Sequence, residues 1–344
     1  MTEPPPPPRA FGEADGDLRH LDGRSIAFIG YGNQGRAQAL NLRDSGADSI
    51  IVGTLRDDSW TQAEEDGFPV RTIAEAAGEG DVLFLLIPDE ELPDVYADEI
   101  APALRPHSAL VLASGYNLTF KGITPPADVD VLLLAPRMIG RQLRQLYERG
   151  EGFYSYLSVE QDASGSAWPL LLALAKGIGT LRLGAFELSA NDETLLDLFH
   201  EQGFGSLLGT TFMLMLEIGV AAGLPPEAMA LDLYLSGEAA ETFHAMADLG
   251  FFEQAALHSV TSQYGGMMRT IEFDREPLRQ HLQRIIDDVR SGEFARRLAA
   301  ERATGYKKFN SLRELAGTAN PFSPIEARIK AALEEAQERG EHGA

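Results

Sequence analysis

In the first half of the chain, short apolar runs alternate with stretches of helical composition such as 36–46 and 168–176. The apolar runs lie at 25–29, 49–53, 81–87, 109–113, 129–134 and 153–159. Their length and their Val, Ile and Leu content are typical of strands that are buried on both faces. The alternation predicts an α/β domain built on a mostly parallel sheet.

From residue 190 onward the strand signals fade, and the pattern predicts helices. The stretch 204–222 is apolar along almost its whole length, which is typical of a helix buried on every face. Because a domain this small cannot cover such a helix alone, we expect a partner chain to cover it. A further helix begins at Pro225-Pro226, and 276–299 reads as an amphipathic, peripheral helix.

A glycine-rich motif follows the first predicted strand directly, and a helix and a second strand follow the motif. This order is the context that the dinucleotide fingerprint G-x-G-x-x-G requires. Gly30 permits the tight turn, Gly32 lets the backbone approach a pyrophosphate, and Gly35 lets helix and strand pack closely. The alternative is a glycine turn without a ligand. The predicted cofactor contacts in this motif are Gly30, Tyr31, Gly32, Asn33, Gln34 and Gly35.

The end of the second strand normally distinguishes NAD from NADP. Arg56 and Ser59 could hold a 2′-phosphate, whereas Asp57 and Asp58 would repel one and accept hydrogen bonds from a free ribose hydroxyl. The aspartates could also simply cap the following helix. We therefore expect NADP or NAD as the cofactor, with Arg56 and Ser59 as candidate contacts.

Polar residues also follow the next three predicted strands, and open parallel sheets bind ligands beyond these carboxyl ends. Pro88-Asp89, Ser114-Gly115 and Arg137 occupy these positions. We expect Pro88, Asp89 and Gly115 to contact the cofactor, and Ser114 and Arg137 to lie beside the substrate. Each of these residues could instead satisfy backbone groups of its own loop.

Two carboxylates interrupt the apolar pattern in the first helix of the second half. Asp197 and Glu201 are four residues apart, so a helix stacks them on one face. The two anions repel each other, and a divalent cation such as Mg²⁺ would relieve this repulsion. The alternative is a helix edge that faces water. In the helix after Pro225-Pro226, Asp232, Ser236 and Glu238 are further polar candidates or surface residues.

Composition narrows the possible partners. The formal net charge is −23, from 29 Lys+Arg against 52 Asp+Glu, which argues against nucleic acid and anionic membranes. The absence of cysteine excludes disulfides, thiolate metal sites and cysteine nucleophiles. No run approaches the length of a transmembrane span, and the Pro-rich N-terminus lacks the features of a signal peptide. We expect a cytoplasmic protein.

Taken together, seven stretches resemble the ketol-acid reductoisomerase (acetohydroxyacid isomeroreductase) family in its short class. They run in collinear order through 29–35, 39–46, 125–131, 161–165, 175–179, 197–202 and 291–295. The resemblance implies a Rossmann domain followed by an all-α, knotted C-terminal domain. It also implies a homodimer or a higher homo-oligomer, which would cover the apolar helix.

The resemblance implies a two-step chemistry on a small hydroxy or keto acid. Two Mg²⁺ ions bind the substrate's oxygens and drive an alkyl shift, and NADPH then reduces the new ketone. Asp197 and Glu201 match the family's metal ligands, and Asp232 and Ser236 fall where a second helix carries two glutamates. Ser259 is the nearest candidate for a substrate-binding serine. The implied metal ligands are Asp197, Glu201 and Asp232, the implied substrate contacts are Ser236 and Ser259, and the implied catalytic residues are Ser114, Arg137, Glu201 and Asp232.

The chain departs from the family at positions that carry chemistry. Ser114 stands where the family has a histidine thought to handle protons, Arg137 replaces a lysine, and Ser236 replaces a glutamate. These changes favour an enzyme repurposed to a related acid, as in homologues that form a cyclopropanol ring. One alternative is the parental reaction, from acetolactate to 2,3-dihydroxyisovalerate in valine and isoleucine biosynthesis. Another is a pseudoenzyme that only binds NAD(P).

The sequence predicts four segments. Residues 1–19 are Pro-rich and then acidic, and they predict a disordered tail. Residues 20–185 predict a dinucleotide-binding Rossmann domain, with its boundary near 183–187. Residues 186–330 predict a helical domain for metal, substrate and dimer contacts, and 331–344 predict a charged, fraying tail.

Overall fold

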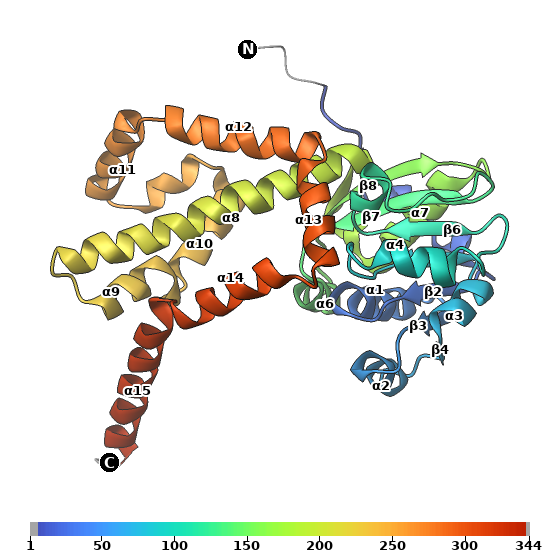
Figure 1. The fold of residues 1–344 in the computed structure, drawn as a ribbon, viewed down its shortest axis with the longest axis horizontal. Coiled ribbons are helices and arrows are strands. Elements are labelled where there is room, and N and C mark those ends of the chain that lie inside the picture. Colours follow the sequence, from blue (N-terminus) through green and yellow to red (C-terminus); the bar gives the residue numbers. More distant parts are fainter. Residues whose placement is uncertain (1–5, 342–344) are drawn as a thin grey trace. The chain divides into compact units, whose positions relative to one another are not determined.

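The computed structural model describes residues 6–341 (Figure 1). The chain divides into two compact units, Met1–Asp197 and Leu198–Ala344. Residues 184–187, near the predicted domain boundary, form a strand of the first unit. The assignment of cofactor binding to 20–185, and of metal, substrate and dimer contacts to 186–330, stays a prediction.

Among the described residues, the first unit contains a nine-stranded sheet in the order β1-β9-β8-β7-β6-β5-β2-β3-β4. From β4 to β7 in this order, each strand runs parallel to the next. Strand β8 runs antiparallel to β7 and parallel to β9, and β1 runs antiparallel to β9. The strands are β1 Ala10–Phe11, β2 Ile26–Ile29, β3 Ile50–Gly53, β4 Val70–Arg71, β5 Val82–Leu85, β6 Ala109–Leu112, β7 Asp130–Pro136, β8 Tyr154–Gln161 and β9 Gly184–Glu187. The Rossmann-type α/β prediction is confirmed.

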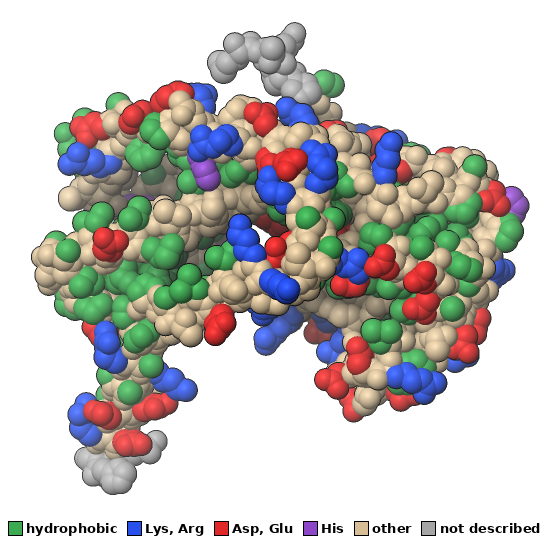
Figure 2. Space-filling view, in the orientation of Figure 1, with side chains coloured by type: hydrophobic (Ala, Val, Ile, Leu, Met, Phe, Trp, Pro, Cys, Tyr) green, Lys and Arg blue, Asp and Glu red, His purple; other side chains and the backbone are tan. Residues whose placement is uncertain are grey.

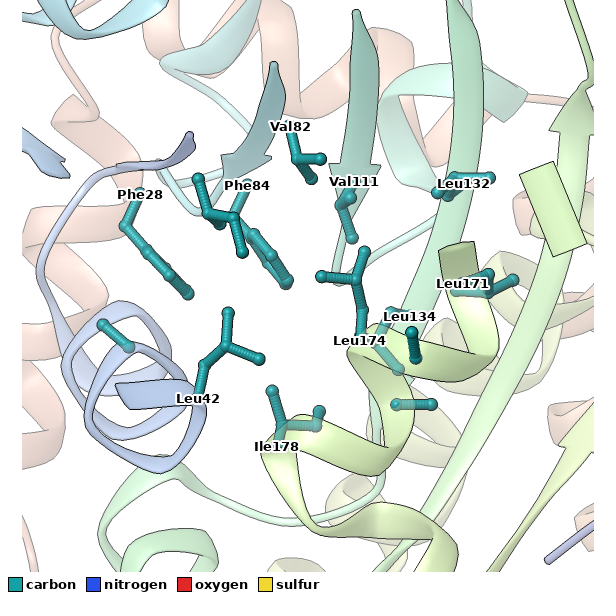
Figure 3. Packing of buried hydrophobic residues seen from close by; sticks show 14 of the residues in the cluster. Phe28, Leu42, Val82, Phe84, Val111, Leu132, Leu134, Leu171, Leu174 and Ile178 are labelled. Carbon is teal, nitrogen blue, oxygen red and sulfur yellow. The ribbon is translucent and has the colours of Figure 1, made fainter. Parts of the chain in front are cut away.

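Helices cover both faces of this sheet. They are α1 Asn33–Asp44, α2 Asp58–Glu65, α3 Ile73–Glu79, α4 Leu92–Val95, α5 Tyr116–Thr119, α6 Gly140–Glu148 and α7 Ala167–Ile178. Short 3-10 helices, η1 Glu13–Asp15, η2 Leu18–Leu21 and η4 Thr180–Arg182, and the π-helix η3 Tyr96–Ile100 complete the unit. Side chains alternate between two cores along each strand: Phe28 packs in one core, and Ala27 and Ile29 in the other. Figure 3 shows Phe28 and Phe84 beside Leu42 of α1 in the first of these cores.

The prediction of a disordered tail at 1–19 is wrong for residues 10–19. Strand β1 pairs with β9, and the Phe11 side chain is buried in the core because it packs against Trp168. The turns η1 and η2 continue the ordered chain to Leu21. Residues 1–5 of the predicted tail lie outside the described residues.

The described part of the second unit is made of helices, as predicted. Helix α8 Ala190–Ala221 begins in the first unit and is followed by α9 Pro226–Ala230, the π-helix η5 Leu231–Leu235, α10 Glu238–Leu249, η6 Glu253–Leu257, α11 Val260–Glu272, α12 Glu276–Arg290, α13 Glu293–Ala303, α14 Lys307–Thr318 and α15 Phe322–Glu341. The single helix predicted at 276–299 is broken at Gly292, which has a φ of 73°. The knot that the resemblance implies stays a prediction.

The charged tail predicted at 331–344 is also corrected. Residues 331–341 continue helix α15, because Ala, Leu, Glu, Gln and Arg are strong helix formers. Residues 342–344 lie outside the described part of the chain.

Helix α8 differs from expectation in two ways. It is one helix of 32 residues, and its length and hydropathy are sufficient to cross a membrane, contrary to the sequence prediction. Within one copy, only 11% of its most apolar window is buried. Figure 2 shows hydrophobic side chains gathered over α8, α9 and α10. The helix that was expected to be buried therefore leaves a large apolar surface open in a single copy.

Candidate functional site

A cavity of about 720 Å³ lies at the carboxyl ends of β2, β3, β5 and β6. Its volume lies in the range of small-molecule and cofactor sites. The predicted site residues that line it are Gly30, Tyr31, Gly32, Asn33, Gln34, Ser59, Pro88, Asp89 and Ser114. Gly35, Arg56 and Gly115, which were also predicted as cofactor contacts, do not line it.

The glycine-rich loop joins β2 to α1 in a shape that only glycine permits. Gly30 has a φ of 97°, and a Cβ at this position would lie 2.6 Å from the Leu86 carbonyl oxygen. A Cβ at Gly35 would lie 2.1 Å from the Gly30 carbonyl oxygen. At Gly32, in contrast, a Cβ would meet no protein atom within 4 Å, and no side chain caps the α1 N-terminus that begins here. The loop therefore leaves open space and backbone N–H groups that fit a dinucleotide pyrophosphate.

Two residues of the motif hold the loop in place. The buried Tyr31 hydroxyl donates a hydrogen bond of 2.9 Å to Asp66, which also pairs with Arg36 at 2.7 Å. Burial, with the hydrogen bond to Asp66, raises the pKa of Tyr31 far above its usual range, so the phenol stays neutral. The Gln34 side chain donates to the Met138 carbonyl oxygen at 2.9 Å. These contacts tie the loop to the end of α2 and to the chain after β7.

The loop after β3 forms the other end of the cavity. The Asp57 carboxylate accepts a hydrogen bond of 2.9 Å from the Ser59 N–H and caps α2, so the capping interpretation is confirmed for Asp57. Asp57 and Ser59 both line the cavity. The Arg56 guanidinium lies 4.7 Å from the centre of the Trp60 ring. A carboxylate thus borders the position where a ribose would lie.

Beyond β5 and β6, Ser114 and Asp89 lie in hydrogen-bond contact. The Ser114 hydroxyl donates to Asp89 Oδ2 at 3.1 Å, and the Asn117 amide donates to Asp89 Oδ1 at 3.1 Å. Burial raises the pKa of Asp89 to about 6, although these two hydrogen bonds oppose the rise. Asp89 therefore changes its charge close to neutral pH.

The end of β7 and the first turns of α8 form an ionic cluster. Arg137 pairs with Glu193 at 3.2 Å and with Asp197 at 2.5 Å. The Glu193 side chain is only 2% exposed, and burial raises its pKa to about 7 in spite of the arginine. Burial alone would lower the pKa of Arg137, but its bonds to the two carboxylates raise it. The guanidinium therefore stays charged between two acids.

These two groups are joined through Gly115. The Gly115 N–H donates a hydrogen bond of 2.8 Å to Glu193, and a Cβ at Gly115 would lie 2.1 Å from the Ala190 carbonyl oxygen. A line of contacts thus runs from Asp89 through Ser114 and Gly115 to Glu193 and Arg137. Glu193 was not among the predicted site residues, although it stands four residues before Asp197 on the same helix face.

The remaining predicted residues lie in the second unit. Asp232 lies within η5 and Ser236 directly after it, and both are exposed. Ser259 caps α11 by accepting a hydrogen bond of 3.2 Å from the Ser262 N–H. Glu201 is exposed one turn beyond Asp197 on α8.

The carboxylate oxygens of Asp197 and Glu201 are donors of the type that Mg²⁺ prefers. Within residues 6–341, no three His, Asp or Glu side chains gather as a metal-binding group. Mg²⁺ commonly uses one or two carboxylates and completes its shell with water and substrate oxygens. The pair on α8 fits a site of that kind.

Two family models cover most of the chain. Residues 20–184 match the acetohydroxy acid isomeroreductase NADPH-binding domain, and 191–335 match the ketol-acid reductoisomerase C-terminal domain. The chain is 40% identical over 309 residues to "Putative ketol-acid reductoisomerase 3" of Saccharolobus solfataricus, which covers 88% of this chain and 92% of that protein.

Solved structures are similar as well. An NADH-preferring ketol-acid reductoisomerase from an uncultured archaeon superposes with a TM-score of 0.87 and 32% identity, over 94% of this chain and 98% of that chain. A semialdehyde dehydrogenase NAD-binding protein from Cupriavidus necator, in complex with calcium and NAD, has a TM-score of 0.58 and 19% identity. That match covers 78% of this chain and 99% of the other, and it shows the fold alone.

Proposed function

Since the chain belongs to the ketol-acid reductoisomerase family, we propose that it is an NAD(P)H- and Mg²⁺-dependent enzyme repurposed to a small hydroxy or keto acid related to the parental substrate. The observation that carries this proposal is the ion-pair cluster of Arg137 with Glu193 and Asp197. A permanent cation bonded to Asp197 reduces the negative charge available to balance two divalent ions. Arginine also cannot release a proton at neutral pH.

Each predicted group has a distinct role in this proposal. The glycine-rich loop holds the pyrophosphate, and reduced nicotinamide, when bound, supplies hydride. Asp197 and Glu201 would hold Mg²⁺, which acts as a Lewis acid on substrate oxygens. Asp232 is the further metal ligand that the resemblance implies. Arg137 fixes the Glu193 and Asp197 carboxylates. Ser236 and Ser259 are the candidate substrate contacts.

The charge of the cluster is the reason to propose a changed reaction. An alkyl shift between neighbouring carbons benefits from two Lewis acids on adjacent oxygens, whereas reduction of a ketone needs only one. With Arg137 paired to Asp197, one ion is the occupancy that the carboxylates support best. A ring-forming reaction of the cyclopropanol type is one candidate chemistry for such a site.

The parental reaction is the second candidate, and the 40% identity to a family member supports it. The repurposed and the parental reactions differ in their substrate. Purified protein with Mg²⁺ and NADH or NADPH is mixed with acetolactate. In separate reactions it is mixed with a panel of small 2-keto acids and 3-hydroxy-2-keto acids. Oxidation of the cofactor is followed by absorbance at 340 nm. We expect oxidation of the cofactor with a member of the panel and none with acetolactate. Turnover of acetolactate would establish the parental reaction instead.

A pseudoenzyme that only binds nucleotide is the third candidate. Calorimetric titration with NADH and NADPH tests cofactor binding directly. We expect NADH to bind more tightly, because the Asp57 carboxylate lines the cavity and would repel a 2′-phosphate. Binding of neither nucleotide would reject the enzyme proposals together, and binding without turnover of any substrate would favour the pseudoenzyme.

The open apolar surface of α8 supports the expected homodimer. Exposed Met213, Leu214 and Ile218 lie on this helix, and a second copy would remove them from water. Light scattering on the 37.4-kDa chain is expected to give a mass of a dimer or a larger assembly. We further propose a cytoplasmic location, as the sequence predicts.

A further inference from the structure

The neighbouring strands β5 and β6 present two polar side chains at one end of the cavity. The strands run parallel in register, with Leu85 opposite Leu112, so the loops that follow them leave the sheet side by side. Asp89 lies in the first loop, Ser114 lies in the second, and both line the cavity. This end is the one away from Asp57 and Ser59, so it is where the nicotinamide ring of a bound cofactor would lie.

The Ser114 hydroxyl has a fixed orientation. It has one hydrogen and two lone pairs. The hydrogen is directed to Asp89 Oδ2 at 3.1 Å, and one lone pair accepts the Tyr116 N–H at 3.2 Å. One lone pair is left, and Ser114 is only partly buried at the cavity wall.

Asp89 is held from its other side. The Asn117 amide donates to Asp89 Oδ1 at 3.1 Å and to the Asp89 carbonyl oxygen at 3.0 Å. Because Oδ1 is engaged, a proton on this carboxyl belongs on Oδ2, the atom that faces Ser114. With that proton in place, Asp89 donates to Ser114, and the serine hydrogen is released toward the cavity.

We infer that Asp89 and Ser114 form a two-residue proton relay for the reacting oxygen of the substrate. Ser114 is the catalytic residue, because it exchanges a proton with that oxygen. Asp89 is a positioning residue that supplies or takes the proton through Ser114. The inference rests on the proposed function, since it assumes that a carbonyl is reduced in this cavity.

The step is balanced in atoms and charge. Reduced nicotinamide, when bound, would supply hydride to the carbonyl carbon. The carbonyl oxygen then forms a bond to the Ser114 hydroxyl hydrogen. The Ser114 oxygen takes the hydrogen of Asp89 Oδ2 as its own O–H bond breaks. Asp89 is left as a carboxylate and regains a proton from water before the next turnover. Oxidation of the alcohol follows the reverse order.

The surroundings of Asp89 suit this exchange. The pKa of Asp89 is raised to about 6, mainly by burial, with hydrogen bonds from Ser114 and Asn117 opposing the rise and the charges of Glu90 and Asp197 adding to it. Tyr116 and Glu193 are the other ionisable groups that interact with its charge. An acid whose pKa lies close to the working pH is the most efficient proton donor and acceptor.

Carbon NMR on protein labelled at the aspartate carboxyl carbons tests the relay without turnover. The Asp89→Asn variant identifies the resonance, which we expect to titrate near pH 6 in the wild type. Ser114→Ala removes a hydrogen bond that favours the charged form, so the midpoint should rise. An unchanged midpoint in Ser114→Ala would show that the two side chains are not coupled, and would overturn the relay.

Kinetics with the substrate found for the wild type give the second test. Asp89→Asn and Ser114→Ala should each lower kcat about a hundredfold or more with little change in KM, and should flatten the pH profile. The double variant should be no slower than the slower single variant, because both act in one proton path. Ser114→Thr keeps the hydroxyl and should recover most of the rate.

Asp130 and Ser164 provide a matched control pair away from the cavity. The Ser164 hydroxyl donates to the buried Asp130 carboxylate at 2.7 Å, at the opposite end of β7. Ser164→Ala should leave kcat and the pH profile unchanged. An active wild type whose Asp89→Asn variant keeps its rate and pH profile would refute the relay alone, whereas a wild type that binds no nucleotide would refute the proposed function.

Discussion

Replacing Glu193 by glutamine should change how the stability of the first unit depends on pH. Glu193 is 2% exposed, and its carboxyl accepts from the Gly115 N–H and pairs with Arg137. Glutamine keeps the shape and an acceptor oxygen for Gly115, but it cannot ionise. The difference in unfolding free energy between the two proteins, followed over pH, therefore reports the free energy of ionising one buried carboxyl.

The magnitude follows from the pKa of Glu193. It rises from an ordinary 4.5 to about 7 in the folded protein, mainly because burial disfavours the charged form. One pKa unit corresponds to about 1.36 kcal/mol, so the change is worth about 3 kcal/mol. Below pH 4.5 both the folded and the unfolded chain carry the proton. Between pH 4.5 and 7 the folded chain binds more protons, so its stability falls as pH rises.

Urea unfolding at pH 4.5, 6 and 8 measures this effect in buffer without divalent cations. Both tryptophans, Trp60 and Trp168, lie in the first unit, so their fluorescence follows the unit that contains Glu193. Between the lowest and the highest pH, the free energy of unfolding of the wild type should fall by about 3 kcal/mol relative to that of Glu193→Gln. Above pH 8 it should fall no further.

Glu75→Gln is the matched control. Its carboxylate is exposed, and hydrogen bonds from Thr72 lower its pKa below the ordinary 4.5. What ionised Glu75 adds to stability is lost only as the pH falls below 4.5. The difference in free energy of unfolding between Glu75→Gln and the wild type should therefore be the same at pH 6 and at pH 8. If Glu193→Gln showed the same constant difference, the burial of Glu193 would not control its ionisation, and the reasoning would fail.

Three further predictions concern the cofactor and the metal. Gly35→Ala should weaken NADH binding about tenfold or more by calorimetry, because its Cβ would lie 2.1 Å from the Gly30 carbonyl oxygen. Gly78→Ala is the control and should bind NADH normally, because its Cβ would lie 3.8 Å from its nearest atom. Asp57→Asn keeps an acceptor for the α2 cap but removes the charge. The ratio of NADPH to NADH affinity should therefore rise about tenfold, and an unchanged ratio would contradict a role of Asp57 in cofactor choice. Asp197→Asn should abolish the heat of Mg²⁺ binding while NADH still binds, and Mg²⁺ binding equal to the wild type would place the ion elsewhere.

The parts of the fold that obey local rules were predictable from the sequence. The glycine-rich loop is one of them, because Gly30 has a φ of 97° and a Cβ at Gly35 would clash with Gly30 within the motif itself. The buried parallel strands are another, because apolar side chains on both faces leave a continuous hydrophobic run. The same reasoning placed Asp89, Ser114 and Arg137 at the carboxyl ends of their strands.

Features that depend on distant contacts were not predictable in the same way. Glu193 becomes a site residue only through Gly115 and Arg137, which lie 78 and 56 residues away in sequence. Strand β1 has only two residues, and its partner β9 supplies the reason for its order. The first helix of the second half and the apolar stretch 204–222 were not predicted as one helix, and they form the single helix α8.

Pairing of β1 with β9 sets the time at which the first unit can be completed during synthesis. Ala10 lies opposite Phe186, so the first strand of the chain waits for the last strand of the sheet. At about 5–20 residues per second, a ribosome needs roughly 10–40 s to reach this point. Throughout that interval the N-terminal segment has no sheet edge to join.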